Sequence, residues 1–482
     1  MTSPKPIIIL ARQLSLTALA LWAIVSRAGA APPADFVLQN GLRIVVRERH
    51  ETPLVAMDLW VRAGAREEAP GETGAAHFLE HTLFKGTTTR HAGEADMAIE
   101  NLGATLSAAT GPDYALYYTS VGAEHAGEAL AVLADVVRNA TLPAEEIERE
   151  RQVIQTELAQ RDSDPTAVLI DRLYQTIYRG HPYSRPPGGT AAAIRARTRD
   201  SLAAFYRRTY RPERCTLVLV GDLTAERAHE IAERAFGDWP SRNDEPSSTA
   251  RPQDGGQKFD PDDSGANKSA NSSNSQPVAT GQQLTETAAA VRPMAGVAFR
   301  APAAAVGPAS CAAQIVAAML GQSDIGGRLA VARLSGCQAR VSFVPRRDTS
   351  LFIVSSAAPP ALPGRLRNHD ELDAAASAQK QILLAVLDGL FTAPPTAGEL
   401  AAAKSALLGR TIFENETNAG LAASLGAAAI TGGQTPEAWR AAIDRVTVQD
   451  VRQFIAQWVD PSRRVALVLL PGAGAGTLDS SP

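Results

Sequence analysis

Two kinds of spacing between apolar residues alternate in the first half of the chain. From Phe36 to Arg49, polar and apolar positions alternate around Asn40-Gly41, which predicts a β-hairpin, and Pro53 to Ala63 continues with a further strand. Later strands are predicted at 104–110, 114–121 and 215–220. Apolar residues three or four apart predict helices at 71–84, 94–102, 124–138, 144–161, 165–178 and 198–210. Strands that alternate with runs of helices in this way indicate an α+β domain.

Strands and helices follow one another in a similar way in the second half. The predicted strands lie at 295–300, 338–344, 350–356 and 464–470. The predicted helices lie at 308–320, from 326–329 onward, and at 370–390, 396–412, 416–430 and 447–458. In both halves a threonine, Thr198 or Thr447, begins a helix, and a proline fourteen residues later precedes the last strand. This recurrence predicts two homologous domains, each a mainly antiparallel sheet packed with helices, although a helix, a proline and a strand in succession are also common by chance.

Composition divides the chain into segments. Residues 243–292 are rich in Ser, Asn, Gln, Asp, Gly and Pro. Such a stretch cannot bury enough apolar surface to offset the entropy of ordering it, so we predict a disordered linker there. The linker separates an N-terminal domain at 31–242 from a C-terminal domain at 293–475, and a tail follows at 476–482.

Residues 1–30 have the pattern of a secretory signal peptide. Lys5 and Arg12 supply positive charge, an apolar run extends from Leu14 to Val25, and Ala28-Gly29-Ala30 fits a cleavage site. The alternative is an uncleaved membrane anchor, but the run is short for a bilayer span and is followed by small residues and prolines. We expect a mature chain that is exported to the periplasm or secreted, with no stable membrane insertion after signal cleavage.

The composition argues against several classes of function. The chain has 482 residues, 45% of them hydrophobic, which is enough for sizeable cores in two or three domains. Its 47 basic and 51 acidic residues give a net charge of -4, which does not favour a nucleic-acid partner or an anionic membrane surface. The three cysteines, Cys215, Cys311 and Cys337, are no disulfide framework, and none has metal-ligand spacing. We expect Cys215 to be a buried thiol and no bridge between the other two.

A His-x-x-Glu-His motif, His77 to His81, lies in the helix predicted at 71–84. Residues four apart share a helix face, so the two imidazoles can point at one ion, with Glu80 beside them. Paired imidazoles are common zinc ligands, and a neighbouring carboxylate can activate a water molecule. The alternative is a pair of surface histidines on an amphipathic helix. The apolar residues that would bury this helix are Phe78, Leu79 and Leu83.

A third protein ligand for a catalytic zinc must come from elsewhere in the chain, because such a site has three protein ligands and one open position. The helix predicted at 144–161 is acidic, and its Glu150 and Glu157 are seven residues apart, which places them on one face. Either residue could supply the ligand. From the spacing alone, both could equally belong to a solvated helix face.

With these residues the sequence resembles the pitrilysin, insulinase and mitochondrial processing peptidase β-subunit family of zinc peptidases, which are inverzincins. That family has His-x-x-Glu-His near the start of its first domain and a distal Glu-Arg-x-Val-Ile-x-x-Glu segment, which matches Glu150 to Glu157 here. Further matches are Tyr210-Arg211-Pro212, Gly221-Asp222 and Gly327-Arg328-Leu329. The resemblance covers nearly the whole mature chain apart from 243–292, and it implies the processing-peptidase-like metallohydrolase fold.

The resemblance implies one zinc ion per chain, held by His77, His81 and Glu157. Glu80 is then the general base, which takes a proton from the zinc-bound water. Glu150 lies near the metal in such enzymes and orients a ligand. The function implied is a zinc-dependent endopeptidase that cleaves unfolded peptides or small proteins.

Substrate binding in this family resembles β-addition, in which an extended peptide pairs with an exposed strand edge. The matching strand consists of Leu106, Ser107, Ala108, Ala109 and Thr110. Backbone pairing gives little sequence specificity, so the expected substrate is unfolded peptide. Ser107 stands where the family usually has asparagine.

Many relatives also carry an Arg and a Tyr in an Arg-Gly-Leu-Ala-Tyr-like segment of the second domain. The corresponding stretch here, Ser335-Gly336-Cys337-Gln338-Ala339, has neither. This departure predicts the zinc-bearing subunit of a two-chain peptidase, paired with a homologous Arg/Tyr-bearing chain, or a homodimer. Two alternatives are a silent structural subunit, which typically loses part of the zinc motif, and a peptide-binding or scaffold subunit that retains zinc with weak turnover. The intact Glu80 favours the peptidase, because a structural zinc is closed by a fourth ligand.

Overall fold

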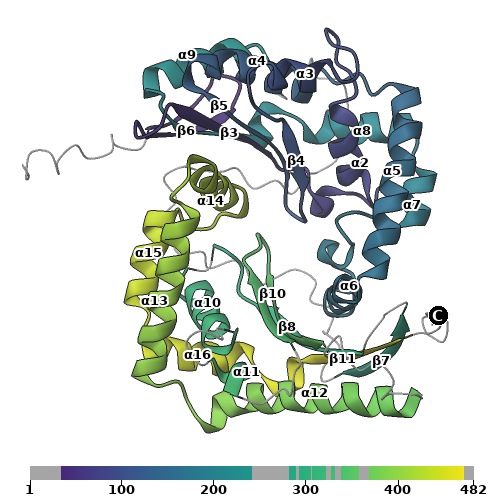
Figure 1. Cartoon of the computed structure of the whole chain (residues 1–482), viewed down its shortest axis with the longest axis vertical. Helices are drawn as coiled ribbons and strands as arrows, with labels where there is room; N and C mark the ends of the chain where they lie inside the picture. Colours follow the sequence, from purple (N-terminus) through teal and green to yellow (C-terminus); the bar gives the residue numbers. More distant parts are fainter. Residues whose placement is uncertain are drawn as a thin grey trace, which may run out of the picture.

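The structure of the protein is a computed structural model. It describes residues 34–241, 282–288, 293–305, 307–321, 327–331, 338–357 and 369–471. The predicted signal peptide and the predicted C-terminal tail lie outside the described residues, as does most of the predicted linker. Two layers of sheet, each with its own helices, make up the described part of the chain (Figure 1).

The first domain is built on a six-stranded sheet with the strand order β1-β2-β6-β3-β5-β4. β1 and β2 form the predicted hairpin around Asn40-Gly41, and β2 and β6 are a parallel pair. The strands are β1 (Ala34–Val37), β2 (Arg43–Glu48), β3 (Leu54–Val61), β4 (Ser107–Thr110), β5 (Ala115–Gly122) and β6 (Cys215–Gly221). The α-helices of this domain are α2 (Ala75–Leu83), α3 (Glu94–Glu100), α4 (Ala126–Arg138), α5 (Ala144–Ser163), α6 (Pro165–Ile177), α7 (Ala191–Ala196), α8 (Arg199–Thr209) and α9 (Ala225–Phe236).

The second domain is built on a five-stranded sheet with the order β7-β11-β8-β10-β9. Its strands are β7 (Gln283–Ala288), β8 (Met294–Ala301), β9 (Gln338–Val344), β10 (Ser350–Ala357) and β11 (Val465–Pro471). Its described α-helices are α10 (Gly307–Gly321), α11 (Arg328–Val331), α12 (His369–Thr392), α13 (Ala397–Glu414), α14 (Asn418–Thr431), α15 (Pro436–Arg445) and α16 (Val448–Trp458).

The two sheets repeat one topology, so the predicted pair of homologous α+β domains is confirmed. The order β2-β6-β3-β5-β4 of the first sheet corresponds to β7-β11-β8-β10-β9 of the second, and each begins with its parallel pair. The prediction of disorder for 243–292 is wrong at 283–288, because those residues form β7 at the position of β2. The segment Gln-Leu-Thr-Glu-Thr-Ala is polar, and as an edge strand it pairs only with β11. Backbone pairing therefore orders it without an apolar signal.

One helix of each domain packs against the sheet of the other domain. On α6, Leu169 and Leu173 pack in one cluster with Leu467 of β11, and on α14, Leu425 packs in one cluster with Trp60 of β3. Figure 1 shows α14 against the upper sheet and α6 against the lower one. This exchange buries the sheet faces that the domains turn toward each other, and it fixes the position of one domain against the other.

Several local predictions differ from the structure. The helices α9 and α15 are absent from the prediction, although the buried positions of α9, among them Ala228, Ile231 and Ala235, recur three or four residues apart. The strand predicted at 104–110 is ordered as β4 only over Ser107–Thr110. Among the described residues, no helix has the length and apolar character needed to cross a membrane.

Candidate metal centre

The motif helix α2 begins at a close contact between two loops. Gly74, the residue before the helix, has φ 83, a conformation that favours glycine. A Cβ on Gly74 would lie 2.7 Å from Ile194 Cδ1, and a Cβ on Gly189 would lie 2.6 Å from Gly74 Cα. The two glycines thus let the chain before α7 pack against the start of α2, which fixes where the motif helix begins.

Glu68 supports the same helix end. Its Oε1 accepts a hydrogen bond from the backbone N–H of Ala76 at 3.1 Å, and the side chain is buried. A carboxylate at a helix N-terminus interacts favourably with the helix dipole. Burial raises the pKa of Glu68 to about 7, although that N–H and the charges of Arg185 and Arg197 act in the opposite direction. The sequence pattern does not single out Glu68, whose only signal is its acidic side chain shortly before the motif helix.

The apolar side of α2 faces the first domain's core, as predicted. Thr82 on this side donates its hydroxyl proton to the carbonyl oxygen of Phe78 at 2.9 Å. The motif residues His77, Glu80 and His81 are left partly exposed on the other side. The residues with 0% exposure that anchor the helix are Phe78, Leu79 and Leu83.

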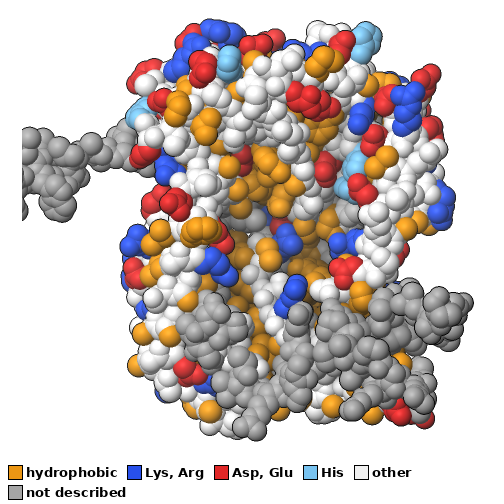
Figure 2. Space-filling model, in the orientation of Figure 1, with side chains coloured by type: hydrophobic (Ala, Val, Ile, Leu, Met, Phe, Trp, Pro, Cys, Tyr) orange, Lys and Arg blue, Asp and Glu red, His pale blue; other side chains and the backbone are white. Residues whose placement is uncertain are grey.

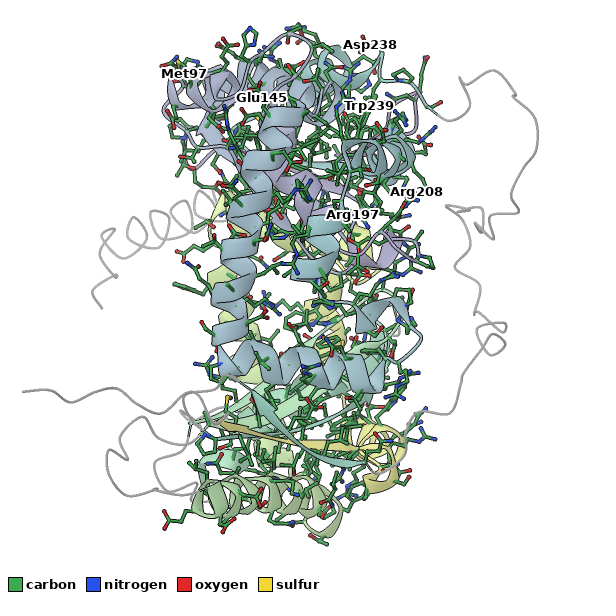
Figure 3. The ribbon with its side chains drawn as sticks, turned by 90° about the vertical axis from the view of Figure 1, so that its right-hand side faces the viewer. Met97, Glu145, Arg197, Arg208, Asp238 and Trp239 are labelled. Atoms are coloured by element: carbon green, nitrogen blue, oxygen red, sulfur yellow. The ribbon has the colours of Figure 1, made fainter. Side chains whose placement is uncertain are left out.

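The long helix α5 brings a carboxylate to the two histidines. Figure 3 shows α5 passing along the outside of the first domain from its start near Glu145. Glu157 Oε2 is 3.4 Å from His81 Nε2 and 3.7 Å from His77 Nε2, and the two Nε2 atoms are 3.3 Å apart. Ligand atoms about 2.0–2.2 Å from a tetrahedral zinc ion are roughly 3.3–3.6 Å from one another. His77, His81 and Glu157 therefore fit one zinc ion.

Glu150 lies two helical turns before Glu157 on α5, and it sets the orientation of His81. Its Oε2 is 3.0 Å from His81 Nδ1, and its Oε1 is 3.1 Å from the Lys85 ammonium group. Because a carboxylate can only accept, His81 Nδ1–H donates to Glu150, and the lone pair of His81 Nε2 points at the ligand triangle. Lys85 is likewise not singled out by the sequence, since it lies after the motif with no pattern of its own.

Electrostatics at the site favour neutral imidazole at His77. Burial, followed by the charge of His81, lowers the pKa of His77, and the charges of Glu80 and Glu157 partly oppose this. Metal ions bind the neutral form of the ring. In the described part of the chain, Glu80 itself has neither a hydrogen bond nor an ion pair through its side chain. A carboxylate that is close to the ligands and not paired can accept a proton from water.

The candidate substrate strand lies at the edge of the first sheet next to α2 (Figure 1). β4 pairs with β5 on one side, and within the described residues no strand pairs with its other side. Ser107, Ala108, Ala109 and Thr110 are all partly exposed, and Leu106 precedes the strand. An unpaired edge beside the ligand triangle has the geometry that β-addition requires.

Two other predicted features lie partly outside the described residues. In the stretch Ser335 to Ala339, only the last two residues are described, and they begin β9. Cys215 is a buried free thiol, as predicted, and Cys311 is also buried and free. Burial raises the pKa of Cys215.

Fold and site together define a class of two-domain α+β proteins with a His-x-x-Glu-His metal centre completed by a distal glutamate. Comparison with family models agrees: the insulinase (peptidase family M16) model matches residues 43–191, and the peptidase M16 inactive domain model matches residues 197–407. The chain belongs to peptidase family M16, the insulinase family.

The chain spans about half the length of the named relatives that it matches. The chain is 36% identical over 199 residues to an uncharacterized zinc protease of Rickettsia bellii, covering 41% of this chain and 48% of the relative. It is 31% identical over 207 residues to the zinc protease YmxG of Bacillus subtilis, covering 43% and 50%. It is 36% identical over 200 residues to the probable mitochondrial-processing peptidase subunit beta of Schizosaccharomyces pombe, covering 42% and 44%.

Solved structures share the fold over nearly the whole chain. A protease from Helicobacter pylori superimposes with a TM-score of 0.77 at 20% identity, covering 92% of this chain and 100% of that one. A peptidase M16 inactive domain from Pseudomonas fluorescens has a TM-score of 0.72 at 18% identity, covering 94% and 100%. At these identities the likeness concerns the fold alone.

Proposed function

We propose that the chain is a zinc-dependent endopeptidase that cleaves unfolded peptides or small proteins. The observation that carries this proposal is the triangle of His77 Nε2, His81 Nε2 and Glu157 Oε2, with edges of 3.3, 3.4 and 3.7 Å, beside the unpaired carboxylate of Glu80. The relatives named zinc proteases support it.

Each residue of the site has a separate task in this proposal. A bound zinc ion supplies Lewis-acid chemistry, which acidifies water and polarises a peptide carbonyl. Glu80 accepts a proton from the attacking water and returns it to the leaving amine. Glu150 holds His81 in the tautomer whose Nε2 is free. The edge of β4 holds the peptide extended beside these groups.

Replacement of the base tests the proposal. Glu80→Gln should keep the zinc content of the wild type and lower kcat for a quenched fluorescent peptide by about 10²-fold or more, the usual contribution of a general base. Glu145→Gln is the control, because it makes the same chemical change in the first turn of α5, at a side chain that is 88% exposed. Cleavage by the Glu80→Gln protein at the wild-type rate would refute the assignment. Zinc binding without turnover, with or without a partner, would favour a peptide-binding or scaffold subunit.

We further propose that the chain is the zinc-bearing subunit of a pair. Support comes from the absence of Arg and Tyr from Ser335 to Ala339 in the sequence and from the likeness to a mitochondrial-processing peptidase subunit beta. Peptide cleavage should rise when a homologous Arg/Tyr-bearing chain is added, and light scattering should show the complex. Full activity of a monomer, unchanged by any such chain, would contradict the pairing.

Export to the periplasm, or secretion, is proposed from the pattern of residues 1–30. When the full chain is expressed in a Gram-negative host, cell fractionation should find the protein outside the cytoplasm, and its N-terminal sequence should begin near Ala31. A full-length protein retained in the cytoplasm would contradict export.

A further inference from the structure

A hairpin of the second domain reaches the end of the candidate substrate strand in the first. The turn between β9 and β10 carries Arg347 and Asp348, whose backbone N–H groups donate to Asp113 Oδ2 at 3.3 Å and to the Tyr183 hydroxyl at 3.2 Å. The Tyr183 hydroxyl in turn donates to Asp113 Oδ1 at 2.6 Å. Asp113 lies in the turn that follows β4. The hairpin tip is therefore held at the point where a peptide paired with β4 would leave the strand.

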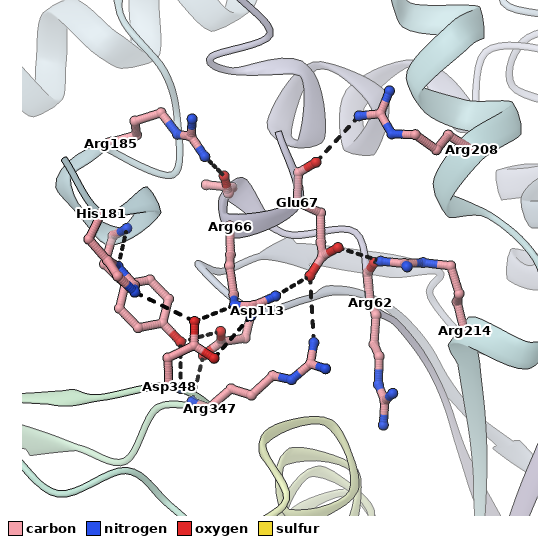
Figure 4. A network of polar contacts seen from close by, with 12 residues as sticks. Arg62, Arg66, Glu67, Asp113, His181, Arg185, Arg208, Arg214, Arg347 and Asp348 are labelled. Carbon is pink, nitrogen blue, oxygen red and sulfur yellow. Dashed lines mark hydrogen bonds and ion pairs between the residues drawn. The ribbon is translucent and has the colours of Figure 1, made fainter. Parts of the chain in front are cut away.

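The carboxylates at this corner are already shared among arginines. Glu67 pairs with Arg66 and Arg214, each at 2.7 Å, and lies 3.5 Å from Arg347. Asp348 accepts two hydrogen bonds from the guanidinium group of Arg66, at 2.6 and 3.0 Å. Figure 4 shows this network with its dashed contacts. Glu67 and Asp348 are thus each paired with guanidinium groups of other arginines, and Asp113 is occupied by the Tyr183 hydroxyl and the Arg347 backbone N–H.

At this corner, Arg62 is a cation whose guanidinium group has no partner among the described residues. It follows β3 directly, and Val61 lies in one row of the sheet with Ala115 and Thr110, so Arg62 is at the Thr110 end of β4. Within the described residues its guanidinium group makes no hydrogen bond or ion pair, and in Figure 4 it points away from the network. Burial, and then the charges of Arg347 and Arg214, lower the pKa of Arg62.

A half-buried guanidinium group among other cations is a site for an anion. Arginine keeps its charge, so it cannot relieve the repulsion by losing a proton, and a partly desolvated charge is stabilised when it is paired. Its planar fork of N–H groups suits a carboxylate with two oxygens. Figure 2 shows Lys or Arg side chains in the hollow between the two domains, below an apolar wall.

We propose that Arg62, with Arg347 beside it, binds a carboxylate of the peptide substrate where the peptide passes the Thr110 end of β4. The inference rests on the proposed function and adds specificity to it. Backbone pairing with β4 accepts many sequences, whereas Arg62 selects peptides with an acidic group at one fixed distance from the cleaved bond. That group is either an acidic side chain or the carboxylate at the peptide's C-terminus.

Matched fluorescent peptides test the inference. One series carries Glu or Gln at each position in turn, and a second ends in a free acid or an amide, so that the two sources of the carboxylate are distinguished. The wild type should show kcat/KM about tenfold or more higher for one acidic member than for its neutral partner, as expected for a charge-assisted hydrogen bond. Arg62→Gln should reduce that ratio to near one, with the larger loss of kcat/KM falling on the acidic peptide.

A control and a binding measurement separate this inference from the proposed function. Arg234→Gln, at a side chain on α9 with 66% exposure, should keep the preference. If no peptide is cleaved, anisotropy of the same labelled peptides is measured with the wild type and with Arg62→Gln. An acid preference in binding that depends on Arg62 would then sustain the subsite although the peptidase proposal fails. An equal response to acidic and neutral peptides, or a preference that Arg62→Gln leaves intact, would overturn the inference.

Discussion

Gly426 of α14, in the second domain, packs directly against Trp60 of β3, in the first domain. The contact is so close that adding one methyl group, as in Gly426→Ala, tests it. A Cβ on Gly426 would lie 1.9 Å from Trp60 Nε1 and 2.3 Å from Cε2. Non-bonded heavy atoms pack at about 3.5–4.0 Å, so either the helix or the ring must move by more than about 1 Å. Trp60 is 3% exposed and packs in one cluster with Val218 and Leu425, so the ring can move only by displacing its neighbours. Gly426→Ala should therefore loosen the docking of α14.

The magnitude follows from two opposing effects. Overpacking of a tight site costs about 1–3 kcal/mol, whereas Ala in a helix interior is favoured over Gly by about 1 kcal/mol. Gly409 of α13 isolates the second effect, because a Cβ there would meet nothing within 4 Å. Urea unfolding followed by circular dichroism should place Gly426→Ala about 1–3 kcal/mol below Gly409→Ala in free energy of unfolding. Equal stabilities of the two variants would refute the close docking of α14.

Three further results are expected. Burial raises the pKa of Asp58, on the sheet face that α14 covers, to about 7. The folded state therefore holds this proton at a higher pH than the unfolded chain does. The free energy of unfolding should then fall by up to about 1.4 kcal/mol per pH unit as the pH rises from about 4 to 7. Asp58→Asn should abolish that fall in urea titrations. Glu150→Gln should weaken zinc affinity about 10–100-fold in chelator competition, because the acceptor of His81 Nδ1–H loses its negative charge. Arg66 and Asp348 should show a coupling of about 0.5–3 kcal/mol in a double-mutant cycle, which vanishes below pH 2 as Asp348, with a pKa lowered to about 2, becomes protonated.

The metal centre was the part of the structure most open to prediction, because its determinants are short-range. Helix periodicity places His77 and His81 on one face and Glu150 and Glu157 on another. Which glutamate completes the triangle depends on how α5 packs against α2, and the resemblance to known peptidases supplied that choice. The structure places Glu157 in the triangle and Glu150 on the far ring nitrogen of His81.

Features that depend on contacts between distant segments were missed. The exchange of α6 and α14 is one example, because an amphipathic pattern indicates that a helix is buried but not against which sheet. β7 is another, because its mostly polar sequence forms a strand through pairing with the distant β11 and packing of Leu284. The isolation of Arg62 likewise follows from the arrangement of Glu67 and Asp348 around the other arginines, which no local pattern records.

The most direct test of the central claim is the X-ray absorption spectrum of the zinc-loaded chain at the zinc edge. We predict a first shell of nitrogen and oxygen at about 2.0–2.2 Å, with multiple scattering from two imidazole rings. Glu157→Gln should alter this shell, and Glu145→Gln should not. A sulfur shell at about 2.3 Å, or a spectrum that Glu157→Gln leaves unchanged, would contradict the assignment of His77, His81 and Glu157 as the zinc ligands.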